Sequence, residues 1–150
     1  ACVLDYGQTP RVTVVLDKTT HTRELIEASG AFALQLPTRA QLALTVGVGT
    51  DSLRTVPDKL VRHGVRLFEA PVGDVPLVTD CVGWLACRLR PEPHNQQAYD
   101  LFIGDMVGAW ADERVFRAGR WQFHTAPDEL RTIHHVAGGQ FFVTGAAVQA

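Results

Sequence analysis

The stretch from residue 12 to residue 36, VTVVLDKTTHTRELIEASGAFALQL, constrains the fold more than any other part of this sequence. Apolar side chains alternate with others from Val12 to Asp17 in a β-branched run, and this period of two predicts a strand. Thr22 is the predicted N-cap of a short helix, because its hydroxyl can accept a hydrogen bond from the first-turn amides. Gly30 is expected to end that helix, since the residue after a helix often has a positive φ. Apolar alternation up to Pro37 predicts a second strand.

The polar turn before this helix, Lys18 to Thr22, carries an ammonium and several hydroxyls but no carboxylate. A helix N-terminus behind such a turn predicts an anion site, because the first amides lack partners and the helix dipole favours negative charge. An ordinary capped helix remains the alternative. The candidate residues in this turn are Thr20, His21 and Thr22.

A second polar segment runs from residue 52 to residue 59 and leads into a predicted helix that starts at Lys59 and stops at Gly64. Two such segments could converge on one phosphate, although each alone is also consistent with a solvated loop. The candidate residues in it are Ser52, Arg54 and Lys59.

The rest of the chain predicts short strands and few helices. A short helix from Thr38 to Thr45 should end at the glycines that follow, and the longest strand should run from Leu77 to Arg90. Gly104 inside the next strand predicts a bulge or a close approach. Seven or eight closely spaced strands with two or three short helices favour a mostly β barrel or sandwich.

Composition limits the class of protein. A chain of 150 residues with 46% hydrophobic content is enough for one domain, residues 1–150, with a substantial core. A net charge of −2 gives no footprint for nucleic acid, and no apolar run approaches the ~20 residues of a membrane span. No signal peptide is visible at Ala1, where a strand is already in progress without an initiator Met, so we expect residues to be missing before it.

Three cysteines are odd in number and lack paired CxxC spacing, which favours a reducing, cytoplasmic setting over a disulfide framework. On the predicted long strand, Cys81 and Cys87 share one face about 20 Å apart, too far for a disulfide. No GxSxG, HExxH or P-loop motif is present, and the adjacent His134 and His135 point to opposite faces of a strand. The sequence therefore identifies no catalytic residue and predicts no metal site.

Taken together, the ordered segments resemble the flavin reductase-like, FMN-binding split-barrel family, which includes flavoredoxin and NAD(P)H:flavin oxidoreductases. Residues 10–37 carry a Thr-bearing turn between strand and helix, and residues 46–67 carry a "G…S…DK" pattern. Residues 76–89 form a long strand, which is followed by an "lfiGeV" strand within residues 94–112. Residues 134–145 carry a Gly-Gly-aromatic strand.

This resemblance implies a split Greek-key β-barrel with short helices that binds one FMN per subunit near a homodimer interface. It implies hydride transfer from NAD(P)H, with the flavin supplying the redox chemistry. Thr22 and Lys59 match positions on the phosphate and ribityl side, with further phosphate contacts at Thr20, His21, Ser52 and Arg54. His94 matches a histidine at the flavin, and Phe141 or Phe142 lies where an aromatic ring covers it.

The sequence departs from the family pattern at two places. A strand pair that carries an Asn, a small hydroxyl residue and a Trp precedes the position of Ala1 in the family, and Ala86 stands where a Glu is frequent. A non-enzymatic flavin or tetrapyrrole carrier, or an interaction domain on the same barrel, is therefore the alternative. Three tryptophans on strands with few covering helices favour a homodimer; they are Trp84, Trp110 and Trp121.

Overall fold

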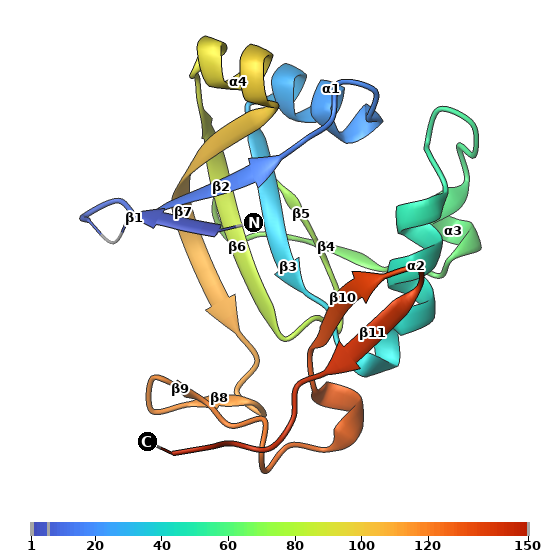
Figure 1. Cartoon of the computed structure of the whole chain (residues 1–150), viewed down its shortest axis with the longest axis vertical. Coiled ribbons are helices and arrows are strands. Elements are labelled where there is room, and N and C mark those ends of the chain that lie inside the picture. Colours follow the sequence, from blue (N-terminus) through green and yellow to red (C-terminus); the bar gives the residue numbers. More distant parts are fainter. Residues whose placement is uncertain (1, 6, 150) are drawn as a thin grey trace.

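A five-stranded antiparallel sheet forms the centre of the computed structural model, which describes residues 2–5 and 7–149 (Figure 1). The sheet is curved, so that β2 crosses in front of β6 and β3 in this view. The described residues are 37% strand and 24% helix, which confirms the predicted mostly β class. In spatial order the strands are β1 (Cys2–Asp5), β2 (Arg11–Val15), β7 (Leu101–Ala111), β6 (Gly83–Arg90) and β3 (Ala31–Leu36).

Three two-stranded hairpins and several short helices surround this sheet. The hairpins are β4 (Leu67–Glu69) with β5 (Pro76–Val78), β8 (Phe116–Arg117) with β9 (Arg120–Trp121), and β10 (Ile133–Ala137) with β11 (Gln140–Val143). The helices are α1 (His21–Ser29), α2 (Leu42–Thr50), α3 (Lys59–Arg62) and α4 (Pro93–Tyr99), with 3-10 turns η1 (Arg39–Gln41) and η2 (Asp128–Leu130). None of the helices in the described residues is long and apolar enough to cross a membrane.

The main core lies between the sheet and α1. Val12 and Val14, the alternate residues of β2, are buried as their period of two predicted, and Ile26 of α1 packs onto them. Gly30 ends α1 with φ 69°, as expected from its position. The remaining buried members of this cluster are Phe32, Cys87 and Phe102.

A second cluster accounts for two of the three tryptophans. Trp84 and Trp110 are cross-strand partners on β6 and β7, and both pack against buried Ala86 and Leu77. Of the three, Trp121 is the exposed one, with 40% of its surface accessible. Trp84 and Trp110 are thus partly covered within the chain, because the β4–β5 hairpin contributes a layer that the sequence pattern did not show, and the homodimer stays a prediction.

The predicted strand from residue 77 to residue 90 is interrupted. β5 ends at Val78, Asp80 adopts φ 66°, and β6 begins at Gly83, so Cys81 lies before the strand. A register shift after Ala86 also breaks the alternation, and both Ala86 and Cys87 are fully buried. The same-face placement of Cys81 and Cys87 was wrong, but both are free thiols, and burial raises the pKa of each to about 11.

Two helix predictions also fail. α2 continues to Thr50 and includes Gly47 and Gly49, which were expected to end it. α4 lies in a segment for which the sequence analysis predicts no helix; Pro93 is its first residue, where a missing N–H costs nothing. Both errors arise because tertiary contacts, rather than local propensity, decide where these helices run.

Close packing at Gly104 confirms its predicted role in β7. A Cβ added there would lie 2.5 Å from Cζ of Phe32, whose ring crosses the strand at this point. Gly104→Ala should therefore lower the free energy of unfolding by about 1–3 kcal/mol through overpacking, measured by urea denaturation. Because Phe32→Leu removes the clashing atoms, the double variant should lose less than the sum of the single variants. If the losses of unfolding free energy in the two single variants simply added in the double variant, the contact between Gly104 and Phe32 would not be the cause. Gly145→Ala is the control, because a Cβ at Gly145 would lie in open space.

Candidate functional site

A cavity of about 350 Å³ opens where the start of α1 meets the end of α2. It brings together the two polar segments that the sequence analysis singled out, although about 30 residues separate them in the chain. The predicted residues that line it are Thr20, His21, Thr22, Ser52 and Lys59. Lining residues that the sequence analysis missed are Thr19, Leu25, Val48, Gly49, Thr50, Asp51 and Leu53.

One wall of this cavity is the N-terminus of α1. The N-cap is Thr20 and not Thr22 as predicted; its backbone is extended (φ −81°, ψ 136°), and no side chain caps the helix. The Thr20 hydroxyl donates instead to the carbonyl of Asp17 at 2.8 Å. Thr19 donates its hydroxyl and its amide to the Asp17 carboxylate, which holds the pKa of Asp17 below its usual value. The first amides of α1 thus remain available to an anion.

The position of α1 is fixed from below by Arg23, which is 5% exposed. Its guanidinium donates to the Asp100 carboxylate at 2.6 Å, to the Gln96 carbonyl at 3.0 Å and to Glu27 at 2.9 Å. It also lies over the ring of Phe102, 5.1 Å from its centroid. These bonds join α1 to α4 and β7, which Figure 1 shows side by side at one end of the sheet.

The opposite wall is the C-terminal end of α2, where Lys59 is held. Its ammonium donates to the carbonyls of Val48 at 3.0 Å and Asp51 at 2.8 Å, which satisfies acceptors that the helix end leaves open. An ammonium has three donors, so one remains for a ligand. Lys59 therefore offers a positive charge in a fixed place rather than on a free side chain.

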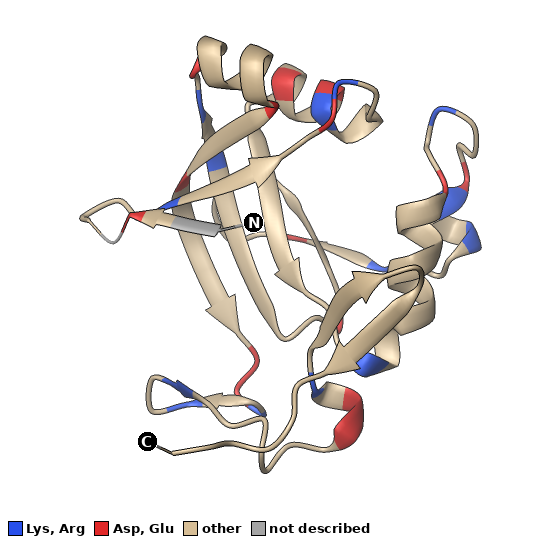
Figure 2. Ribbon diagram, viewed as in Figure 1, with Lys and Arg blue, Asp and Glu red and all other residues tan. Residues whose placement is uncertain are grey.

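Arg54 lies beside the cavity rather than in its lining. It donates to the Thr19 carbonyl at 2.9 Å and forms an ion pair with Glu24 of α1. His21 bonds the other oxygen of Glu24 at 2.9 Å, and the two contacts, that of His21 first, lower the pKa of this carboxyl. Figure 2 shows that both α1 and the loop after α2 carry basic and acidic residues. Arg54 thus connects the two walls of the cavity.

The remaining predicted residues lie away from this cavity. His94 is on α4 and packs edge-to-face with Tyr99, with ring centroids 5.6 Å apart. Phe141 is on β11 and faces His135 across the hairpin at 4.8 Å. Neither belongs to the lining, so their flavin contacts stay predictions.

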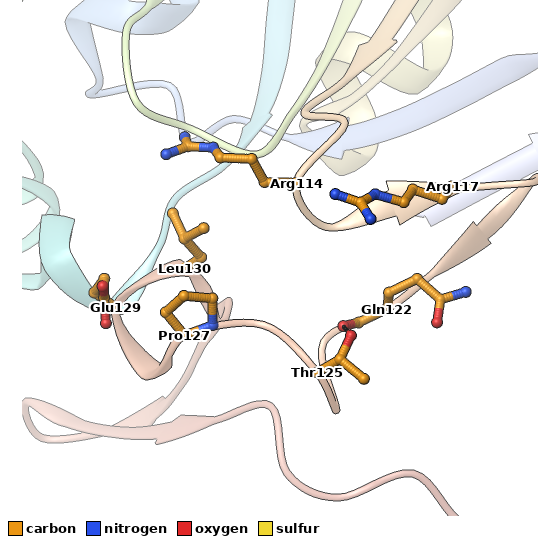
Figure 3. Close-up of a pocket in the computed structure, with 7 residues that line it drawn as sticks. All are labelled: Arg114, Arg117, Gln122, Thr125, Pro127, Glu129 and Leu130. Atoms are coloured by element: carbon orange, nitrogen blue, oxygen red, sulfur yellow. Dashed lines mark hydrogen bonds between the residues drawn. The ribbon is translucent and has the colours of Figure 1, made fainter.

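A second cavity, of about 590 Å³, lies between the β8–β9 hairpin and η2 (Figure 3). Its charged lining residues are Arg114 and Arg117 on one side and Glu129 of η2 on the other, and the cavity lies at the opposite end of the sheet from α1 (Figure 1). Arg114 is neutralised by Asp112, at 2.6 Å, and Arg117 donates its Nε to the Glu113 carbonyl at 2.9 Å. None of the predicted site residues lines it, so we place the candidate site at the α1 cavity.

The fold is that of a known class of proteins. The family model for the flavin reductase-like domain matches residues 7–128, and the chain belongs to that FMN-binding domain family. The FMN-binding domain of a flavin reductases-like enzyme from Shewanella baltica OS155 is 53% identical, with a TM-score of 0.95 over 99% of this chain and 78% of that one.

Two further proteins are similar to this chain in sequence or in fold. The uncharacterized protein YddH of Escherichia coli K12 is 44% identical over 142 residues, which are 94% of this chain and 74% of that protein. Flavoredoxin of Desulfovibrio vulgaris (Miyazaki F) is 21% identical, with a TM-score of 0.79 over 97% of this chain and 76% of that one, and so shows the fold alone. The predicted split-barrel class is confirmed.

The residues of the α1 cavity fit the phosphate end of FMN. Free helix amides, hydroxyls and one ammonium are the donors that a phosphate ester needs. Leu25, Val48 and Leu53 give the same cavity apolar surface for the carbon chain of a ligand. Among the described lining residues, Asp51 is the one acidic side chain that does not suit an anion.

Arg54 should determine how firmly the two walls are joined. Arg54→Gln removes the ion pair with Glu24, which is a weak interaction because water screens both exposed side chains. Amide hydrogen exchange in residues 51–58 should therefore accelerate about two- to fivefold. Arg66→Gln breaks a comparable exposed pair, between Arg66 directly before β4 and Asp80, and should leave these amides unchanged. Equal exchange in both variants would show that Arg54 does not join the walls.

Proposed function

We propose that this chain binds FMN with its phosphate in the α1 cavity and acts as an NAD(P)H-dependent flavin reductase. The observation that carries the proposal is the convergence of an uncapped helix N-terminus and a fixed ammonium, Lys59, on one cavity. Family membership and the FMN-binding domain of the 53% identical Shewanella baltica protein support the choice of FMN.

The side chains of this chain bind and orient the cofactor. The α1 amides and the Thr22 hydroxyl donate to the phosphate, while Lys59 supplies a point charge. Bound FMN would supply the redox chemistry, namely hydride transfer from NAD(P)H and electron transfer to free flavin or to a partner. Because the protein binds and orients the cofactor while the cofactor supplies the chemistry, the sequence needs no catalytic acid or base.

A homodimer in the cytoplasm is part of the same proposal. Large apolar side chains remain exposed on several strands, among them Val15 at 70%, Phe142 at 59% and Val136 at 47%. Burying them against a second copy would remove this area from water. Two buried free thiols are compatible with a reducing compartment.

Absorbance spectroscopy of the purified protein tests the function. After FMN is added and free flavin removed, the flavin bands should stay with the protein and bleach when NADH or NADPH is supplied without oxygen. Bound flavin that no nicotinamide reduces would favour the carrier alternative, and protein that retains no FMN would overturn the proposal. Light scattering of the same preparation should give the mass of a dimer; a monomer at micromolar concentration would contradict the homodimer.

The phosphate contacts have a specific signature. A hydrogen bond to a charged group is worth about 1.5–3 kcal/mol, so Lys59→Ala should weaken FMN binding roughly tenfold to a hundredfold. Thr22→Val should cost less because the helix amides remain. Riboflavin lacks the phosphate, so its affinity should hardly change in either variant.

Flavin fluorescence titration measures both ligands in each variant. Lys18→Ala is the matched control, since this exposed lysine stands in the same turn but outside the lining of the cavity. If Lys59→Ala weakened FMN and riboflavin equally, or neither, Lys59 would not contact the phosphate.

A further inference from the structure

Asp51 is an acidic residue in the lining of a cavity that we assign to a phosphate. Two anions in one small cavity repel each other unless a cation or a hydrogen-bond donor compensates one of them. The lining itself offers Lys59, but its ammonium bonds the carbonyl of Asp51 and not the carboxylate. Compensation of the carboxylate must therefore come from another residue.

His63, directly after α3, compensates the Asp51 carboxylate from outside the cavity. Its Nε2 lies 2.8 Å from Oδ2 of Asp51, and the two side chains are only 22% and 25% exposed. An ionised carboxylate can only accept, so Nε2 carries the proton of this bond. His63 does not line the cavity, and it therefore holds Asp51 from behind.

The backbone of α2 is adapted to this imidazole. A Cβ on Gly47 would lie 2.3 Å from Nδ1 and 2.5 Å from Cε1 of His63, so the ring lies directly on the last turn of the helix. Here a glycine inside α2 is explained by contact, because any other residue would push the ring away from Asp51. The amide of Asp51 also donates to the Gly47 carbonyl at 3.0 Å. Helix, ring and carboxylate thus form one rigid unit.

We propose that His63 is a positioning residue that turns the Asp51 carboxylate away from the ligand phosphate and compensates its charge, so that the cavity discriminates in favour of phosphorylated flavin. This inference rests on the proposed function. His63 touches no ligand and acts through Asp51. The described charged groups on the elements around the ring are Asp51 at the end of α2, Lys59 and Arg62 on α3, and Asp58 directly before α3, which pairs with Arg62.

Flavin fluorescence titration of four proteins with FMN and with riboflavin tests this role: the unaltered chain, His63→Phe, Asp51→Asn and the double variant. Phenylalanine keeps a flat ring against Gly47 but cannot donate. His63→Phe should weaken FMN binding about three- to tenfold and leave riboflavin unchanged. In the double variant no carboxylate remains to be compensated, so FMN affinity should return to that of Asp51→Asn.

The double variant separates this role from a structural one. Equal weakening of FMN and riboflavin in His63→Phe, or a double variant as weak as His63→Phe, would overturn the inference. If His63→Phe fails to fold, Asp51→Asn alone decides: a compensated carboxylate predicts less than about a threefold change in FMN affinity, and any larger gain overturns the inference. If the unaltered chain binds no FMN, the proposed function fails, and this inference with it.

Discussion

The buried guanidinium of Arg23 is the interaction on which the arrangement of the site depends. It lies beneath α1 and bonds groups from the end of β2, from α4 and from the residue before β7, which are Leu16, Gln96 and Asp100. A planar group with five donors can satisfy several acceptors only in one orientation. Because Arg23 sits in the first turn of α1, this orientation also fixes where the helix N-terminus points. A lysine would supply the charge but not this geometry.

The second wall of the cavity, at the C-terminal end of α2, is also held by a cationic side chain that donates hydrogen bonds to open acceptors. The C-terminal carbonyls of α2 need donors, and Lys59 supplies them from the next helix along the chain. His63 occupies the adjacent surface of α2 over Gly47. The loop between these helices is thereby closed on itself, and Arg54 at its tip reaches across to Thr19. Satisfying the polar groups of two helix ends thus creates a cavity with donors on both sides.

This arrangement supports the proposed anion site in a protein whose net charge is −2. The positive character comes from helix amides and one oriented ammonium, while the nearby carboxylates are each bonded: Asp17 by Thr19, Glu24 by His21 and Arg54, and Asp51 by His63. A local surplus of donors, rather than overall charge, defines the site. The larger cavity at the other end of the sheet lacks this surplus, because Asp112 neutralises Arg114.

Local patterns in the sequence determined the elements that carry the cavity. The period of two from Val12 to Val14, the polar turn and Gly30 predicted β2, α1 and its end, because each depends on contacts within a few residues. The paired polar segments also predicted an anion site, and the cavity does unite them. The continuation of α2 through Gly47, the helix that starts at Pro93 and the break at Asp80 were decided by the tertiary structure. So were the buried Arg23 and the contact of His63 with Asp51, since their partners lie 77 and 12 residues away in the chain, where no local pattern reaches.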